Sequence, residues 1–246
     1  MNKMIFILMI FLSTTSWAQT SPNITSGRPG VSIGTEVVGT QVFQVQSGVT
    51  LNRYSESNKT DDWVSDNFLR YGLDERFEVS TNINYRIHER IGSGIDNLMI
   101  GGRVNLIAEA DGWIPSLAFQ TRWKMKGSGD FKNEEIRPEN ILSSIHNIGR
   151  AGIINLNLTH SYSGDGGHPI YGYIANWTMA LDDKWSVFLE EYAQHDGEQW
   201  SHAWDTGAAY LVHKDLQLDF SFGYDLESGY NSSFYSLGVS WRTSLI

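Results

Sequence analysis

The sequence contains no cysteine. Disulfides and thiolate metal ligands are therefore excluded, and backbone pairing with side-chain packing must hold the fold together. Basic residues are also scarce, with 18 Lys and Arg against 28 Asp and Glu and a formal net charge of −10. Proteins that bind nucleic acid use Lys and Arg to neutralise phosphates, so this balance argues against a nucleic-acid partner.

Long apolar runs are absent except at the start of the chain. Lys3 precedes an apolar run over residues 4–12, and the small residues Ser16 and Ala18 follow it. This order is typical of a secretory signal peptide, and we expect cleavage after Ala18. The run is too short for a transmembrane helix, which needs about 20 apolar residues. Any membrane crossing by the rest of the chain must therefore use strands.

A strict alternation of apolar and polar residues is present instead, most clearly over residues 216–226. One face of this stretch carries Leu216, Leu218, Phe220, Phe222, Tyr224 and Leu226, and the other carries Gln217, Asp219, Ser221, Gly223 and Asp225. Successive side chains of a strand point to opposite faces, so one face is apolar and the other polar. In a membrane barrel the apolar face of such a strand contacts lipid, and its polar face contacts the aqueous lumen.

Similar segments of about ten residues recur from residue 41 to the end of the chain. They predict an all-β fold, a single closed antiparallel up-and-down transmembrane barrel of about 12 strands. The alternation is weakest over residues 140–148. Over residues 185–194 apolar residues occur on both faces, so the sequence does not decide which face points to lipid. Gly92–Gly94 is expected to form a loop that reverses the chain.

The connections alternate between short turns and longer loops. Short turns of such barrels face the periplasm, so both termini are expected there. Aromatic residues gather near both strand ends, as expected for the two membrane interfaces. Those near the loops are Trp63, Tyr85, Trp123, Tyr171, Trp204, Tyr224 and Tyr235, and those near the turns are Phe43, Tyr71, Phe77, Trp113, Trp185 and Trp241.

The expected organisation has three parts: a signal peptide at residues 1–18, an irregular periplasmic lead-in at residues 19–40, and an outer-membrane barrel at residues 41–246. The lead-in contains Pro22 and Pro29 and lacks sustained alternation. The expected location is the bacterial outer membrane. The partners expected there are membrane lipid and lipopolysaccharide, the barrel-assembly machinery and a small-molecule solute, with no cofactor.

Charged residues on the lumen-facing positions carry both signs. The candidates for a lumen lining or constriction are Glu78, Arg86, Arg103, Glu109, Arg122, Asp205, Asp219, Asp225 and Arg242, with Lys124 and one of Glu190 and Glu191 beside them. A barrel of 12 strands should have a narrow, partly filled bore. Two interpretations stay open: an ion-pair network that satisfies the interior, and a constriction that orients a small solute.

Four histidines, His160, His168, His195 and His202, flank the loops between neighbouring strands near acidic residues. They are weak metal candidates, because no regular ligand spacing accompanies them. His160 and Ser161 also raise the alternative of a lipid hydrolase acting at the barrel rim. However, adjacent residues of a strand point to opposite faces, which does not suit a nucleophile and its base.

Several segments, taken in order, resemble the MetA-pathway of phenol degradation family of outer-membrane proteins. They are Arg28-Pro-Gly with Gly34-Thr35, Leu69-Arg-Tyr-Gly-Leu-Asp-Glu-Arg-Phe-Glu-Val79, Ile100-Gly-Gly-Arg-Val-Asn-Leu106 with Ile114-Pro115, Leu189-Glu-Glu-Tyr192, Asp205-Thr-Gly-Ala-Ala-Tyr210 and Phe234-Tyr-Ser-Leu-Gly-Val-Ser-Trp-Arg242. The resemblance covers nearly the whole mature chain and consists of strand patterns, with no catalytic signature. One departure is the end, Thr243-Ser-Leu-Ile246, where such barrels commonly finish on an aromatic residue that serves assembly.

The resemblance implies an outer-membrane barrel for uptake of small compounds, often aromatic, with no established reaction. We therefore expect a channel or transporter and no enzyme. The alternatives are the rim hydrolase and a plugged structural barrel whose loops bind a partner, for which the long connection at residues 126–139 is suited.

Overall fold

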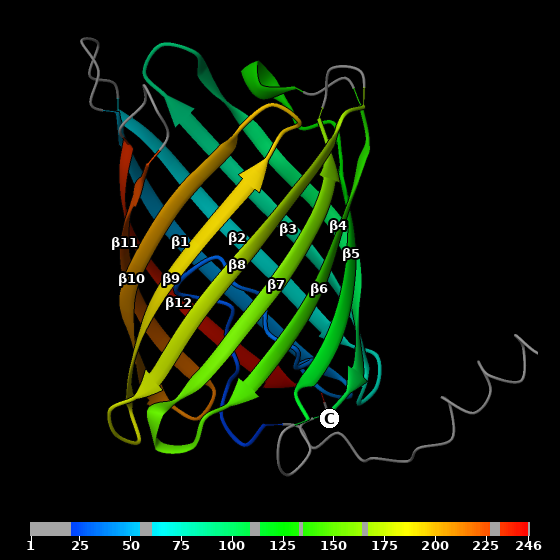
Figure 1. Ribbon diagram of the computed structural model, residues 1–246, viewed down its shortest axis with the longest axis vertical. Coiled ribbons are helices and arrows are strands. Elements are labelled where there is room, and N and C mark those ends of the chain that lie inside the picture. Colours follow the sequence, from blue (N-terminus) through cyan, green and yellow to red (C-terminus); the bar gives the residue numbers. More distant parts are fainter. Residues whose placement is uncertain are drawn as a thin grey trace, which may run out of the picture.

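A computed structural model describes residues 21–54, 61–108, 114–132, 135–163, 167–226 and 232–245. Within these residues twelve antiparallel strands form a closed barrel (Figure 1), which confirms the predicted fold class. The strands are β1 (Val42–Tyr54), β2 (Asp61–Gly72), β3 (Phe77–His88), β4 (Gly92–Ile107), β5 (Ser116–Lys124), β6 (Arg137–Asn147), β7 (Ile153–Tyr162), β8 (Pro169–Ala180), β9 (Trp185–His195), β10 (Trp200–His213), β11 (Leu216–Asp225) and β12 (Ser232–Ser244).

Each strand pairs with its neighbours in the sequence, and β1 closes the barrel on β12 over its whole length, from Val42 opposite Ser244 to Tyr54 opposite Ser232. Because the sheet closes on itself, it has no free edge, and backbone groups of the wall are satisfied by neighbouring strands. Two short 3₁₀ turns, η1 (Gly129–Phe131) and η2 (Gly149–Ala151), lie in connections. No helix in the described ranges is long and apolar enough to cross a membrane.

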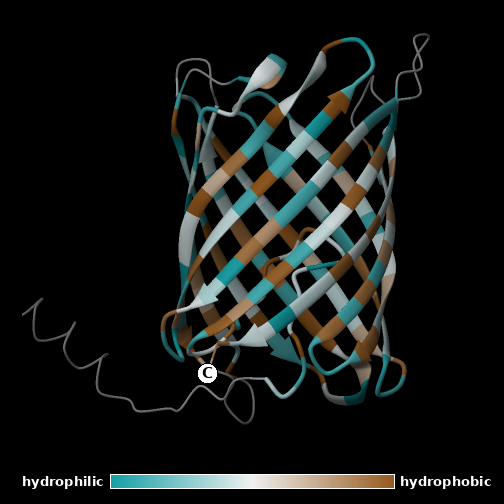
Figure 2. Ribbon diagram, turned by 180° about the vertical axis from the view of Figure 1, so that it is seen from behind, coloured by the Kyte–Doolittle hydropathy of each residue, from teal (hydrophilic) through white to brown (hydrophobic). Residues whose placement is uncertain are grey.

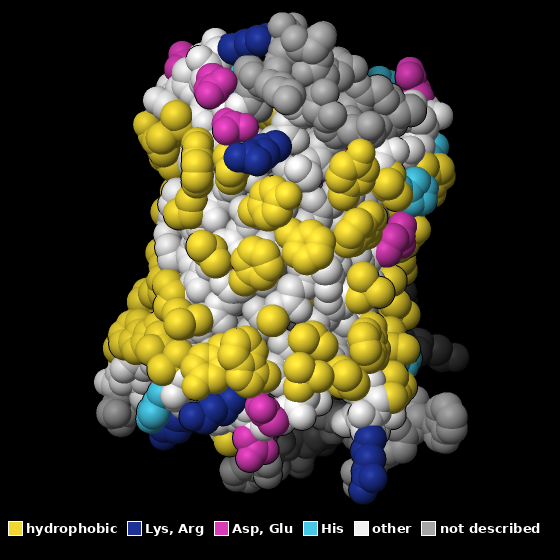
Figure 3. All heavy atoms as spheres, turned by 90° about the vertical axis from the view of Figure 1, so that its left-hand side faces the viewer, with side chains coloured by type: hydrophobic (Ala, Val, Ile, Leu, Met, Phe, Trp, Pro, Cys, Tyr) yellow, Lys and Arg dark blue, Asp and Glu magenta, His cyan; other side chains and the backbone are white. Residues whose placement is uncertain are grey.

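The alternation of β11 is reproduced by the side-chain exposures. Phe220 and Phe222 on the outer wall are 42% and 38% exposed, whereas Asp219 and Ser221 on the inner wall are buried. Figure 2 shows the same alternation of hydrophobic and hydrophilic residues along the strands. Hydrophobic side chains cover the side of the outer wall seen in Figure 3, most densely toward its lower rim.

The sequence did not decide which face of strand β9 points outward. In the structure Trp185 and Leu189 lie on its outer face, and both are about half exposed. Phe188 points inward and is buried. Its ring lies so close to Gly30 that a Cβ atom on Gly30 would be 3.0 Å from it. An apolar residue faces the lumen here because a segment inside the barrel packs against it.

The prediction of a loop over Gly92–Gly94 is wrong. The chain reverses at residues 89–91, and strand β4 already begins at Gly92. The connection that contains η1 packs on this part of β4, where Ser93 N donates to Asp130 and Ile95 N to the Ser128 hydroxyl. A Cβ atom on Gly94 would lie 2.1 Å from the Ser128 carbonyl oxygen. The glycines therefore permit close approach of two segments and do not mark a turn.

The two ends of the barrel differ in their connections. We call the turn end the one that carries the connections 73–76, 181–184 and 214–215, and the loop end the one that carries the connection 125–136. Both described ends of the chain lie at the turn end, since Arg242 near the C-terminus donates to the Ser21 carbonyl oxygen, 3.0 Å away. The periplasmic location of this end stays a prediction.

Residues 21–40 form no helix or strand, and they lie within the barrel, where their blue trace is visible behind the front strands (Figure 1). This position differs from the expected one in the periplasm. We call this stretch the lumenal segment. Its contacts are described below, because they define the candidate site.

The outer wall gives a first test. Leu237 of β12 is 65% exposed between the aromatic residues Tyr235 and Trp241, and Leu245 lies beyond Trp241 at the turn end. Arg in the apolar band of a barrel costs about 2–4 kcal/mol at mid-depth and about 0–1 kcal/mol near an interface. Leu237→Arg should therefore lower the free energy of unfolding in lipid vesicles far more than Leu245→Arg. Equal losses in urea titrations of the two variants would contradict a lipid-facing wall.

Candidate functional site

The lumenal segment enters and leaves the barrel at the turn end. On entry, the Arg242 guanidinium donates to the carbonyl oxygens of Ser21 and Pro22, and Ile24 N donates to the Lys214 carbonyl oxygen at 2.7 Å. On exit, the Thr40 hydroxyl donates to Glu75 at 2.6 Å, directly before β1 begins. The chain thus makes a single excursion into the lumen and returns to the end from which it came.

Arg28 anchors this excursion to the wall of the barrel. Its Nη1 lies 2.5 Å from Asp66 Oδ1 on β2, its Nε 3.2 Å from Asp219 Oδ1 on β11, and its Nη2 2.8 Å from Ser236 Oγ on β12. The wall makes room for it with glycine, because a Cβ on Gly48 or Gly238 would lie within 2.5 Å of the guanidinium. One side chain therefore binds three strands around the closure of the barrel.

Beyond Arg28, inward-facing side chains of the wall satisfy the backbone of the segment. Glu190 on β9 accepts hydrogen bonds from the backbone N–H groups of Val31 and Ser32, at 2.7 and 3.0 Å. Asn157 on β7 accepts from Ile33 N and donates to the Ile33 carbonyl oxygen. An irregular segment away from water needs such partners, since a buried backbone group without one is costly.

A buried charge cluster holds the returning half. Glu78 on β3 receives Arg70 Nη2 at 2.7 Å, and Arg103 Nε lies 3.7 Å from its other oxygen. Val38 N donates to the same carboxylate at 3.0 Å, and both arginines donate to the Glu36 carbonyl oxygen at 2.9 Å. All three charged side chains are almost fully buried. The cluster therefore joins the wall to the segment, with the Glu78 carboxylate shared by two guanidinium groups that both also donate to the Glu36 carbonyl oxygen.

The structure brings some of the sequence-predicted lumen residues together and separates others. Glu78 and Arg103 share the cluster above, Asp219 binds Arg28, and Asp205 lies beside Glu190 in the lumen wall. The others form local pairs: Arg86 with Asp62 and Asp96, Arg122 with Glu139, Asp225 with Ser232, and Arg242 with Asp215. Glu109 lies outside the described residues.

Sequence reasoning missed Arg28 and Arg70. Arg70 could have been found, because it alternates with the outward residues Leu69 and Tyr71 and so must face inward. Arg28 gave a weaker signal, a single cation in a segment without periodicity. The predicted lumen residues carried more acidic than basic groups, which called for an additional cation. No sequence pattern around Arg28 identified it as that cation.

The four histidines do not converge. His160 packs on the rings of Tyr162 and Tyr171, His195 on Trp200, and His168 is exposed, while His202 Nδ1 lies 3.0 Å from Glu191. Among the described residues, no group of three or more His, Asp or Glu side chains could hold a metal ion. His160 and Ser161 follow each other on β7, so they point to opposite sides of the wall.

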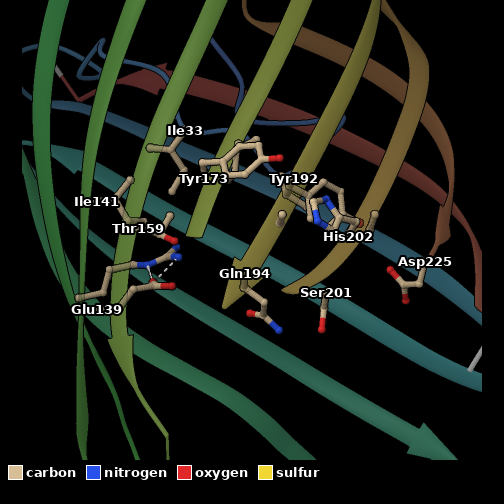
Figure 4. Close-up of a pocket in the computed structure, with 15 residues that line it drawn as sticks. Ile33, Glu139, Ile141, Thr159, Tyr173, Tyr192, Gln194, Ser201, His202 and Asp225 are labelled. Carbon is tan, nitrogen blue, oxygen red and sulfur yellow. Dashed lines mark hydrogen bonds and ion pairs between the residues drawn. The ribbon is translucent and has the colours of Figure 1, made fainter. Parts of the chain in front are cut away.

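Three cavities lie along the lumen. The outer cavity, near the loop end, has a volume of about 360 Å³ and is lined by apolar and polar residues; Figure 4 shows Glu139 on one side of it, Asp225 on the other, and Gln194 and Ser201 between them. The middle cavity has about 320 Å³ and the inner cavity, near the turn end, about 330 Å³. Val31 and Tyr192 line both the outer and the middle cavity, and Arg28 lines both the middle and the inner one. Residues 28–31 of the lumenal segment therefore divide the bore.

The buried cluster predicts a large loss of stability from a single change. Glu78→Ala leaves Arg70 and Arg103 buried without their carboxylate, and removing one partner of a buried ion pair costs about 3–5 kcal/mol. Urea unfolding of the folded barrel should show this loss. Asp183→Ala in the exposed turn between β8 and β9 is the control and should change little. A stability of Glu78→Ala equal to that of the control would show that the cluster does not hold the segment.

Comparisons with known proteins agree with this architecture. The model of a family described as "Putative MetA-pathway of phenol degradation" matches residues 26–243. An outer membrane channel from Pseudomonas putida F1 superposes with a TM-score of 0.66 at 12% identity, covering 89% of this chain and 100% of that one. The NanC porin superposes with a TM-score of 0.60 at 11% identity, covering 79% of this chain and 98% of that one.

The translocator domain of the autotransporter NalP from Neisseria meningitidis gives a TM-score of 0.51 at 12% identity, covering 83% of this chain and 89% of that one. At these identities the similarities establish the fold, which is that of outer-membrane barrels. No curated protein matches the sequence.

Proposed function

Because this chain belongs to the family described as "Putative MetA-pathway of phenol degradation", matched over residues 26–243, we propose that it is an outer-membrane channel for small molecules. The observation that supports this most directly is the series of three cavities along a closed barrel, divided by residues 28–31. The lumenal segment is then the constriction of the channel. Solutes pass between this segment and the wall, and the bore is too narrow for folded proteins.

The lining of the outer cavity favours small solutes with an apolar part, aromatic compounds included. Ile33, Ile141 and Tyr192 offer apolar surface there, and the Arg122–Glu139 ion pair offers polar contacts. Ligand sites commonly combine an apolar lining with a few placed polar groups. The family resemblance agrees with this solute class.

The location follows from the same proposal. The signal peptide is cleaved after Ala18, the turn end faces the periplasm, and the loop end faces lipopolysaccharide. Lipid contacts the hydrophobic outer wall, and the barrel-assembly machinery inserts the chain. Strands whose outer faces carry an apolar band bounded by aromatic rings suit such a membrane.

A second candidate, the plugged structural barrel, is favoured by the many hydrogen bonds between the lumenal segment and the wall. Glu190, Asn157 and Glu78 each bind its backbone. In this case the segment would close the bore permanently, and the loop end would supply the function by binding a partner.

Deleting residues 21–40 distinguishes the two. In planar bilayers the full chain should conduct, and the deletion variant should show a several-fold higher single-channel conductance because its constriction is gone. A variant in which a Gly/Ser linker of equal length replaces residues 21–40 is the matched control, and its conductance should lie between the two.

Folding of each variant is checked by its heat-modifiable mobility in gels. Unchanged conductance in the folded deletion variant would contradict the assignment of the constriction. A full chain that passes no small solute in liposome swelling, with a deletion variant that does, would favour the plugged barrel.

A further inference from the structure

Val31 and Tyr192 mark the passage between the outer and the middle cavity. They are the two residues that line both cavities, Val31 from the lumenal segment and Tyr192, labelled in Figure 4, from strand β9. A solute that moves from one cavity to the other therefore passes between an aliphatic side chain and a phenol ring.

Strand β9 holds the two sides of this passage together. Phe188, Glu190 and Tyr192 are successive inward-facing residues of this strand, because every second residue points to the same face. The ring of Phe188 packs on Gly30, where a Cβ atom would lie 3.0 Å from it. Glu190 accepts a hydrogen bond from Val31 N at 2.7 Å. Tyr192 is the next residue of this row, so one strand both binds the segment and provides the ring that lies beside it.

The hydroxyl group of Tyr192 is available to a solute. The neighbours of Tyr192 in the sheet, Ile174 on β8 and Ala203 on β10, are apolar and line the outer cavity with it. No residue in the described part of the chain forms a hydrogen bond with this hydroxyl group, and its oxygen is not enclosed. A hydroxyl group both donates and accepts, so it can bind the polar group of a passing solute in either role.

The passage offers no charge in return for lost water. Val31 and Tyr192 are uncharged, and the Arg122 guanidinium of the outer cavity is bound to Glu139. An ion that sheds water between the two side chains is therefore not compensated, which is costly. An uncharged solute with a hydroxyl group loses less, because the Tyr192 hydroxyl group replaces one of its hydrogen bonds to water.

We propose that Tyr192 determines the specificity of the channel, and that its passage admits small uncharged solutes with a hydroxyl group in preference to ions and to larger solutes. The ring of Tyr192 and the side chain of Val31 set the width of the passage. The Tyr192 hydroxyl group forms a hydrogen bond with the solute at the point where the solute loses water. The proposal rests on the channel function and names the residue and the solute class that this function selects.

Removal of the ring tests the width of the passage. In planar bilayers Tyr192→Ala should raise the single-channel conductance of the full chain several-fold, because the narrowest part of the bore is widened. In liposome swelling, the rate with glucose should approach the rate with the smaller sugar arabinose. Phe234→Ala is the matched control, since Phe234 lines the middle cavity and not the outer one, and it should change both measurements little. Equal conductance of the two variants would overturn the proposal.

Removal of the hydroxyl group alone tests the solute class. Tyr192→Phe keeps the ring, so its conductance should equal that of the unaltered chain. Its swelling rate with arabinose should fall about fivefold, because a passing solute loses one hydrogen bond. Tyr235→Phe, on the outer wall, is the control and should leave both measurements unchanged. A swelling rate of Tyr192→Phe equal to that of this control would also overturn the proposal.

A thiol at the same position tests the passage without relying on the stability of Tyr192→Ala. The chain has no cysteine, so Tyr192→Cys carries a single thiol, and its reaction with a bulky methanethiosulfonate should reduce the conductance several-fold. Leu189→Cys, on the outer face of the same strand, should react without a change in conductance. Unchanged conductance after reaction of Tyr192→Cys would contradict the proposal while leaving the channel function intact. Absent conductance and swelling in every variant, deletion of residues 21–40 included, would contradict the channel function itself.

Discussion

The structure depends on one constraint: every polar group inside a closed barrel must find a partner inside that barrel. Twelve strands enclose a bore too wide for wall side chains to fill alone and narrower than that of the large porins. The lumenal segment occupies this space, and its backbone brings unsatisfied N–H and C=O groups with it. Glu190, Asn157 and Glu78 satisfy those groups, and Arg28 in turn satisfies Asp66 and Asp219. Wall and segment therefore stabilise each other.

This mutual dependence also sets where a solute can bind. Where segment and wall are fully matched, as around Glu78, the charged side chains are almost fully buried and paired, and their role is structural. Where they are not matched, cavities remain, and Arg28 and Val31 of the segment line the middle one. Sequence patterns present the polar interior as one ion-pair network. The structure separates it into a buried structural part around Glu78 and a part that lines the outer and middle cavities.

The wall could be predicted from the sequence because its pattern is local. Alternation in β11 and in most other strands gave the strand number, the antiparallel order and the outward residues. The position of residues 21–40 could not be predicted in this way, since contacts distant in sequence determine it: Arg28 binds Asp219, 191 residues away. Phe188 is apolar yet faces inward for the same reason, because Gly30 packs on it. Which inward charges pair across the lumen depends on strand register, and alternation alone does not supply it.

The central claim, that the lumenal segment lies inside the folded barrel, is tested most directly by a disulfide. The hydroxyl oxygens of Thr35 in the segment and Ser116 on β5 lie 2.7 Å apart, and the chain has no native cysteine to compete. Thr35→Cys with Ser116→Cys should cross-link on mild oxidation of the folded protein, because side chains in such contact suit a disulfide. Thr35→Cys with Leu117→Cys, one residue further along β5 and on its outer face, should not. Equal cross-linking of the two pairs, or none in either, would place the segment outside the barrel and contradict the account.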